Sequence, residues 1–307
     1  MKKYIILISV LLLLSSCIDF TSPERFTEEA YYVTGILRAN KTVDFDDPII
    51  IGKTIPVEGG TFDDLLIVDA EVMLFEMDQS NTIIDSTALI FAVNPFNLEQ
   101  FGYVDISGNI VIVSEYKYRI EVLINSIDLV WAETIVPKTI QVVADSLVTN
   151  NSGYITDPSV SIWPEMIFDD IDLEHPIQII TQDNETFNLH AGFYCLEEWK
   201  DAEYIFAMEE DTFPEDEEEY ESEADGSPRK TNTFYIFQPT DNLINFSFYQ
   251  YAFNFYGRYE VTVSSIDDNY LNYLYKPEGY NHGGINGGVG YFGSAVSHVM
   301  YTKVVEE

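Results

Sequence analysis

The sequence predicts a mainly β protein, with an N-terminal Ig-like or transthyretin-like β-sandwich over 30–140 and a second β-rich module over 141–307 with few short helices. Short runs of β-branched and aromatic residues follow one another between turn formers, at the spacing typical of a sandwich. Apolar and charged residues alternate over 116–122, as in a half-buried strand. The chain is 46% hydrophobic, which is enough to build a folded core.

The strands of the first module are expected in six apolar runs that end at Pro137. We place a soft module boundary near residue 140, where turn signals begin to separate the runs. The expected strands are 31–37, 47–57, 65–77, 82–93, 108–124 and 127–136.

The second module contains further strand candidates and two segments with helical character. A short helix is expected at 267–276, N-capped by Asp267 or Asp268, and residues 199–208 have roughly helical spacing. The segment 209–225 holds 11 acidic residues among 17 and predicts a solvated, disordered acidic loop. The expected strands are 139–148, 176–181, 187–196, 231–238, 244–253 and 258–266.

The N-terminus resembles a lipoprotein export signal. Lys2 and Lys3 precede an apolar run that is shorter than the ~20 residues of a membrane-spanning helix, and Leu14-Ser15-Ser16-Cys17 follows it like a lipobox. We therefore predict a signal peptide at 1–16, lipid attachment at Cys17 and a tether at 17–29. The alternative is an ordinary secretory signal with a chance cysteine. The lipid would place the protein on a membrane that it does not cross.

Net charge and cysteine content limit which partners and which disulfides are expected. A formal net charge of −37 argues against nucleic acid as a partner, because phosphate binding depends on Lys and Arg. After acylation of Cys17 only Cys195 remains, so no intramolecular disulfide is expected. Cys195 lies between aromatic residues and is predicted to be a buried structural thiol.

No catalytic, metal or cofactor motif is present. The four histidines do not cluster in sequence, and HExxH, GxSxG and phosphate-loop patterns are absent. Acidic groups at 44–47, 169–172 and 267–268 lack the spacing of an EF-hand, although an irregular calcium site stays open. The glycine-rich segment 276–295 is expected to be a tight loop that leads into a final packed strand around Val289, Tyr291 and Phe292.

Two motifs carry a resemblance to a known family. The first is A-x-T-x-x-P, and the second is I-x-G-G-x-G-x-F-G near the C-terminus. Together with the lipobox, they are similar to a family of Bacteroidota outer-membrane lipoproteins of unknown function, often encoded near TonB-dependent receptors. The resemblance implies a mostly β fold and transfers no catalytic residues. The motif residues are Ala132, Thr134, Pro137, Ile285, Gly287, Gly288, Gly290, Phe292 and Gly293.

These observations favour a lipid-anchored, non-catalytic binding or accessory component of an outer-membrane receptor or transport system. The face of the membrane that it occupies is left open. One alternative is a carboxylate-dependent hydrolase acting on glycans, whose acids come together only on folding. A second is a structural or adhesive surface protein.

Two tripeptides suggest modification. Asp85-Ser86-Thr87 and Asp145-Ser146-Leu147 resemble the Asp-Ser/Thr-aliphatic pattern of periplasmic O-glycosylation in Bacteroidota, so Ser86 and Ser146 are candidate acceptors. Chance and turn chemistry are competing explanations for both.

Overall fold

The structure is a computed structural model. It describes residues 30–54, 65–78, 80–144, 153–171, 177–180, 188–197, 203–205, 233–237, 243–245 and 252–307; for 141–144, 177–180, 233–237 and 243–245 only the backbone is described. The segment 1–29, with Cys17 and the tether, lies outside this part of the chain. Ser146 and the acidic segment 209–225 also lie outside it.

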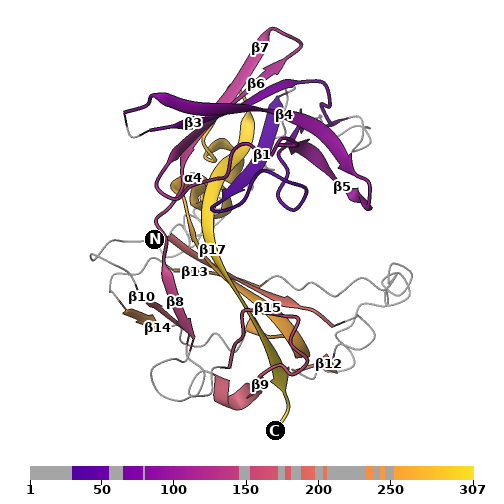
Figure 1. Cartoon of the computed structure of the whole chain (residues 1–307), viewed down its shortest axis with the longest axis vertical. Coiled ribbons are helices and arrows are strands. Elements are labelled where there is room, and N and C mark those ends of the chain that lie inside the picture. The colour runs from indigo at the N-terminus through magenta and orange to yellow at the C-terminus, as the bar shows by residue number, and fades with distance from the viewer. Residues whose placement is uncertain are drawn as a thin grey trace, which may run out of the picture.

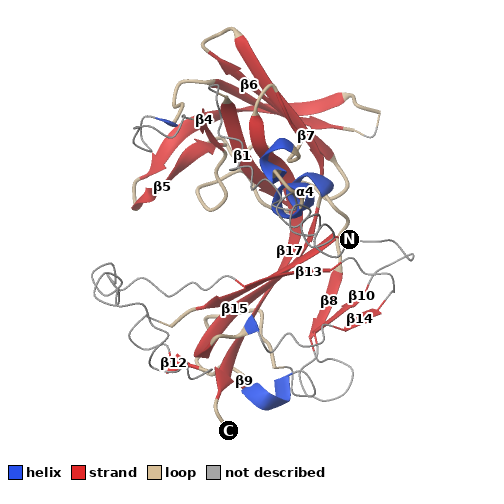
Figure 2. Ribbon diagram, turned by 180° about the vertical axis from the view of Figure 1, so that it is seen from behind, coloured by secondary structure: helices blue, strands red, loops and turns tan. Residues whose placement is uncertain are grey.

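The described chain is mainly β, which confirms the predicted fold class (Figure 2). The first module holds β1 (Tyr31–Arg38), β2 (Ile50–Lys53), β3 (Glu71–Met77), β4 (Ile83–Asn94), β5 (Asn97–Val104), β6 (Lys117–Ile124) and β7 (Asp128–Ile135). Next come β8 (Gln141–Ala144), β9 (Glu165–Ile167), η2 (Phe168–Asp170), β10 (Ile177–Ile180), β11 (Asn188–Cys195), β12 (Glu203–Tyr204), β13 (Thr233–Phe237) and β14 (Leu243–Asn245). The chain closes with β15 (Phe255–Ile266), α4 (Asp268–Tyr275), η6 (Gly279–Asn281), β16 (Ile285–Asn286) and β17 (Val289–Val305).

The first module is a two-layer sandwich. One layer is a six-stranded sheet in the order β16-β7-β6-β3-β4-β5, and the other is formed by β2, β1 and the first half of β17. Side chains on the inner faces of both layers share one core, in which Val33 and Phe292 of one layer lie in the same cluster as Leu74 and Tyr118 of the other. Alternation along β6 places Tyr118, Ile120 and the later even-numbered residues inside, as expected.

β17 belongs to both modules (Figure 1). Its residues Val289 to Ala295 pair in parallel with β1, and Ala295 to Val304 pair antiparallel with β15. One continuous sheet, in the order β13-β11-β15-β17-β1-β2, therefore spans both modules, with β17 as the strand that joins their parts. The core of the first module is completed by Phe292 and Val296, so the segment 30–140 alone does not contain that whole core.

The second module is built on β15, flanked by β11 and the second half of β17. Its core is rich in aromatic rings: Phe253 packs edge-on against Phe193 and Tyr259, with centroids 5.2 Å and 4.8 Å apart. Cys195 is fully buried in the same cluster, which confirms the predicted structural thiol. A three-stranded sheet, β14-β10-β8, is separate from this layer.

Several elements differ from the sequence prediction, among them β2 and β3, which are shorter than expected. The expected strand 108–124 begins only at Lys117. Asp105 first turns the chain by accepting from the backbone of Ser107, Gly108 and Ile110, and a second turn at 114–115, where Glu115 has φ +69°, directly precedes the strand. β5 was not predicted, since its polar residues hide the period of two. Residues 203–204 of the helix-like stretch pair with β15 as a strand, so long-range pairing overrides local spacing there.

Candidate functional site

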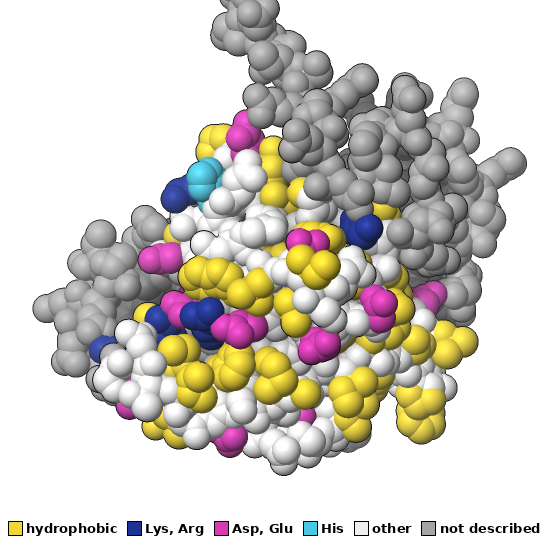
Figure 3. All heavy atoms as spheres, turned by 90° about the horizontal axis from the view of Figure 1, so that it is seen from above, with side chains coloured by type: hydrophobic (Ala, Val, Ile, Leu, Met, Phe, Trp, Pro, Cys, Tyr) yellow, Lys and Arg dark blue, Asp and Glu magenta, His cyan; other side chains and the backbone are white. Residues whose placement is uncertain are grey.

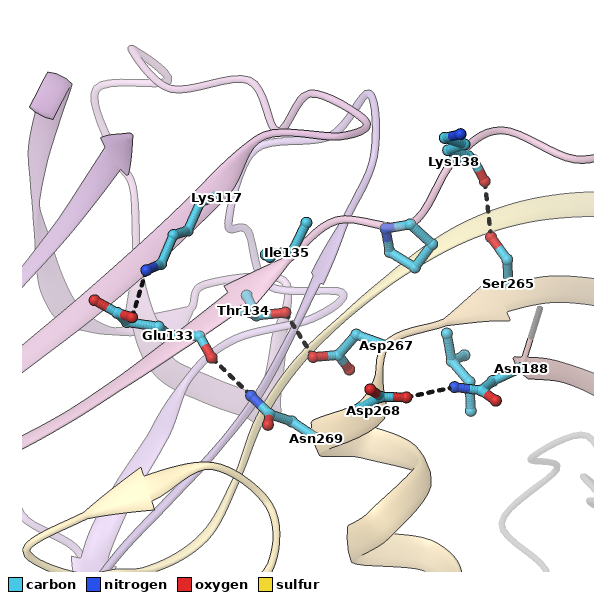
Figure 4. A pocket seen from close by; sticks show the side chains of 12 residues that line it. Lys117, Glu133, Thr134, Ile135, Lys138, Asn188, Ser265, Asp267, Asp268 and Asn269 are labelled. Carbon is cyan, nitrogen blue, oxygen red and sulfur yellow. Dashed lines mark hydrogen bonds and ion pairs between the residues drawn. The ribbon is translucent and has the colours of Figure 1, made fainter. Parts of the chain in front are cut away.

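A polar cavity of about 490 Å³ lies where the two modules meet (Figure 4). It is bounded by the end of β7, the chain that leaves it, and the transition from β15 to α4. The lining residues are Lys117, Glu133, Thr134, Ile135, Pro137, Lys138, Asn188, Ser265, Ile266, Asp267, Asp268 and Asn269. This cavity is the natural place to look for the carboxylate pair of a hydrolase.

Asp267 is the most deeply placed acid of the cavity, and hydrogen bonds hold it from three elements. Its Oδ2 accepts from the Thr134 hydroxyl at 2.7 Å, and its Oδ1 accepts from the backbone N–H of Tyr270 and of Ser294, both at 3.1 Å. Asp267 is the N-cap of α4, as the sequence predicted. Burial raises the pKa of this carboxyl, although its hydrogen bonds oppose the shift.

The other polar groups of the cavity also bond within the protein. Asn269 Nδ2 donates to the carbonyl oxygens of Glu133 and Phe292, at 2.7 Å and 2.9 Å. Asp268 accepts from Asn188 at 2.9 Å, and the Ser265 hydroxyl donates to the Lys138 carbonyl at 3.1 Å. Figure 4 shows the bonds of Asp267 to Thr134, Asn269 to Glu133 and Ser265 to Lys138 crossing the junction between the modules. The arrangement is therefore a polar clamp between β7 and the β15–α4 corner.

The two motifs found in the sequence meet at this clamp. Ile285 pairs with Ala132 on neighbouring strands, and the Thr134 hydroxyl lies 2.7 Å from that of Ser294. Gly290 has φ +109°, and a Cβ there would lie 2.2 Å from the Val33 carbonyl oxygen, so only glycine fits beside β1. The motif residues thus hold β16 and the first half of β17 against β7 and β1 of the first module, and the final strand after the glycine segment is confirmed.

The outer face of the six-stranded sheet presents a different kind of surface. Cross-strand pairing aligns Met73 with Glu121 and Trp131 in one row, and Phe75 with Arg119 in the next. The Arg119 guanidinium lies over the Trp131 ring, 4.6 Å from its centroid. We call this surface the outer sheet face: Glu71, Met73, Phe75, Ser86, Ala88, Ile90, Lys117, Arg119, Glu121, Leu123, Leu129, Trp131, Glu133 and Ile135.

Apolar side chains on the outer sheet face are open to solvent. Ile135, Ile90 and Leu129 are 60%, 55% and 48% exposed. Charges between them are paired, since Lys117 lies 2.6 Å from Glu133 and Arg119 lies 2.6 Å from Glu121. Figure 3, which views the molecule from this end, shows hydrophobic side chains with a group of basic and acidic ones among them. A contiguous face of this kind is typical of a docking surface.

The histidines and acidic clusters of the sequence do not form a site within the described residues. His190 is buried, and burial, together with Arg38, lowers its pKa to about 4, so the ring is neutral near pH 7. His282 is exposed, and His175 lies outside the described ranges. Asp47 is bound by Arg38 at 2.6 Å. Among the described side chains, no group of three or more His, Cys, Asp or Glu is placed to hold a metal ion.

Of the two candidate acceptors for glycosylation, Ser86 can be located. It lies exposed on β4, opposite Phe75 on β3, and therefore on the outer sheet face. A glycan at Ser86 would cover part of this face. The outer sheet face itself was not predicted, because its residues come from four strands whose register cannot be read from local sequence.

Comparisons with known proteins add little to this description. No protein-family model matches the chain. No curated protein matches it either. One solved structure, described as "Structural insight into host cell surface retention of a 1.5-MDa bacterial ice-binding adhesin", is similar with a TM-score of 0.19 and 9% sequence identity, over 91% of this chain and 65% of the other. The chain thus spans less than two thirds of that protein. Within the described residues, no helix is long and apolar enough to cross a membrane.

Proposed function

We propose that the protein is a lipid-anchored, non-catalytic binding component of the outer membrane that docks through its outer sheet face onto an envelope protein. The partner class that we propose is an outer-membrane receptor or transporter, such as a TonB-dependent receptor. The observation that carries the proposal is a set of solvent-exposed apolar side chains on one sheet face, Leu129, Ile135 and Ile90, on the same face as the stacked Arg119 and Trp131. Tryptophan and arginine are the residues most enriched at binding hot spots.

The charges of the face also suit a protein partner. Each basic side chain near its centre has an acidic neighbour, as between Lys117 and Glu133 or Arg119 and Glu121. Such a surface offers no net positive charge to nucleic acid or to anionic lipid, in a chain whose formal charge is −37. It does offer hydrogen-bonding groups around apolar contact area, which is the composition of protein interfaces.

A glycan hydrolase receives less support from the junction cavity. Such an enzyme needs one carboxylate to act on the substrate and a second to act as acid or base. Asp267 instead caps α4 and accepts from Thr134 and Ser294, while Asp268 is bound to Asn188. These partners give both acids structural roles: Asp267 links β7 to the β15–α4 corner, and Asp268 ties α4 to β11.

Site-specific crosslinking in the native host tests the proposal. A photo-reactive amino acid at Leu129 or Ile135 should crosslink to an outer-membrane receptor or transporter, identified by mass spectrometry. The same group at Ile106, which is 65% exposed in a turn outside the face, should not. The double variant Leu129→Lys with Ile135→Lys should weaken the purified complex by about 30-fold or more, because hot-spot losses reach 2 kcal/mol.

A matched control separates this effect from a change in surface charge. Val68→Lys with Ile106→Lys adds the same two charges at side chains that are 52% and 65% exposed but lie outside the face. This variant should bind like wild type. Equal crosslinking from Ile106 and Leu129, or equal affinity losses in the two double variants, would contradict docking through the outer sheet face.

A further inference from the structure

A second site lies in the other module, at an open groove of about 670 Å³ beside β9, β15 and β17. The groove is at the end of the molecule that carries the C-terminus, away from the outer sheet face (Figure 1). Its volume lies within the range of small-ligand sites. The lining residues are Ser161, Ile162, Trp163, Glu165, Glu197, Arg258 and Lys303.

The floor of the groove is set by strand register. Arg258 on β15 pairs with Lys303 on β17, and Lys303 pairs with Glu165 on β9, so three charged side chains form one row across the sheet. Tyr301 lies two residues before Lys303 on the same face, and Trp163 packs edge-on against it with centroids 5.6 Å apart. The Trp163 and Tyr301 rings therefore lie beside this row of charged side chains.

The ionic groups of the groove hold each other in place. The Glu197 carboxylate accepts from Arg258 Nε at 2.9 Å, from Nη2 at 3.2 Å and from the Arg258 backbone N–H at 2.8 Å. Gly257 makes this approach possible, because a Cβ there would lie 2.3 Å from the Glu197 side chain. Lys303 Nζ lies 2.7 Å from Glu165. Fixed, paired donors and acceptors of this kind are pre-organised for a ligand.

The charge balance of the groove selects the ligand class. Two acids and two bases line it, so an anion would compete with Glu197 for Arg258, and a cation would compete with Lys303 for Glu165. A neutral ligand with many hydroxyl groups would instead donate to the carboxylates and accept from the guanidinium and ammonium groups without breaking either pair. Its apolar C–H surface would pack on the aromatic ring.

Trp163 has an accessible ring. It is half-buried, and the Arg258 guanidinium lies 6.0 Å from the ring centroid, at the outer limit of a cation–π contact. In the outer sheet face, by contrast, Arg119 lies 4.6 Å from Trp131 and stacks closely on it. The wider spacing at Trp163 leaves ring surface for a ligand. We propose that this groove binds a neutral oligosaccharide, with Trp163 as the stacking platform and Arg258, Glu197, Glu165 and Lys303 as hydrogen-bonding partners.

Isothermal titration with defined oligosaccharides tests the site on the full chain. The probes are neutral gluco-, xylo- and manno-oligosaccharides of two to six residues, beside an oligogalacturonate as the anionic counterpart. We expect at least one neutral series to bind, and Trp163→Ala to weaken it by about 30-fold, as for a hot-spot residue. Phe96→Ala is the matched control: this aromatic side chain is 97% exposed in the turn between β4 and β5, outside both the groove and the outer sheet face, and its removal should leave the affinity unchanged. Trp163→Tyr keeps an aromatic ring and should retain most of the binding.

A second variant keeps the proposal falsifiable if Trp163→Ala does not fold. The Arg258 side chain is 50% exposed, so Arg258→Gln should keep the fold, checked by its thermal midpoint, and lower the affinity by about 10-fold. Absence of binding to every neutral series would overturn the proposal. Preferential binding of the oligogalacturonate, or equal losses in Phe96→Ala and Trp163→Ala, would overturn it as well. None of these results bears on protein docking at the opposite end, which is measured independently.

Discussion

At the scale of single residues, Asp267 connects local and long-range structure. The same carboxylate caps α4 and accepts from Thr134 of the first module and Ser294 of β17. It is also shielded from water, which raises its pKa. The folded state therefore holds a proton on Asp267 at a higher pH than the unfolded chain does, and this difference links stability to pH.

The sign of that linkage gives a prediction. Because the pKa of Asp267 is raised on folding, its contribution to stability is complete below the unfolded value of about 3.9 and is lost as pH rises through the folded pKa. Asp267→Asn has no such titration. The free energy of unfolding of wild type minus that of Asp267→Asn should therefore fall as pH is raised from 4 toward 7, in urea unfolding at each pH.

Asp105 supplies a control of opposite sign. Although burial opposes it, hydrogen bonds from Ser107, Ile110 and Thr87 lower the pKa of Asp105. Its contribution is present above the unfolded pKa and is lost as pH falls through the folded pKa, so the difference between wild type and Asp105→Asn should grow as pH rises. A pH-independent difference for Asp267→Asn would show that its carboxyl has the same pKa in both states.

At the scale of secondary-structure elements, β17 determines whether the two modules can fold separately. One 17-residue strand supplies a parallel partner to β1 and an antiparallel partner to β15. Parallel pairing of two strands needs a long connection, and here that connection is nearly the whole chain. A module boundary in sequence near residue 140 therefore does not mark two independently complete folding units.

A fragment experiment checks this consequence. The segment 30–144 lacks Phe292 and Val296, which are both buried in the core of the first module, and it leaves β1 without its β17 partner. Loss of a buried Phe side chain alone costs about 3–5 kcal/mol, a large part of a domain's stability. We expect this fragment to show no cooperative unfolding transition by circular dichroism.

Restoring the missing strand is the control. Residues 284–296, joined to the fragment through a flexible linker of roughly 20 residues, can reach β1 in the parallel sense. The fusion should regain a cooperative transition. If fragment 30–144 alone unfolds cooperatively at the same midpoint as the fusion, the contribution of β17 to the first module is not required.

At the scale of the whole molecule, the two proposed binding surfaces lie at opposite ends. The outer sheet face is at one end, and the groove at Trp163 is at the end that carries the C-terminus (Figure 1). An anchored protein with this layout could contact an envelope partner with one end and a neutral glycan with the other. The proposed membrane attachment rests on Cys17, which lies outside the described residues.

Anchoring is tested by removing the acylated thiol. Cys17→Ala should abolish labelling by a radioactive or clickable fatty acid and should move the protein from the membrane to the soluble fraction, because lipid burial supplies its membrane affinity. Cys195→Ala is the control, since this cysteine is fully buried in the second core. Persistent labelling of Cys17→Ala would exclude lipid attachment at this position.

Local sequence by itself determined much of the secondary structure. Alternation specified the faces of β6, capping chemistry placed the start of α4 at Asp267 or Asp268, of which the structure uses Asp267, and aromatic neighbours indicated a buried Cys195. These features could be predicted because they depend on residues within a few positions of each other. β5 escaped prediction, since its polar residues are tolerated at an edge of the sheet.

Tertiary structure alone decided which distant residues meet. The bonds of Thr134 to Asp267 and to Ser294 join positions 133 and 160 residues apart. The outer sheet face and the groove at Trp163 likewise arise from the register of separate strands. No local pattern encodes that register. It is fixed by the burial of both cores together and by the pairing of β17 with β1 and with β15.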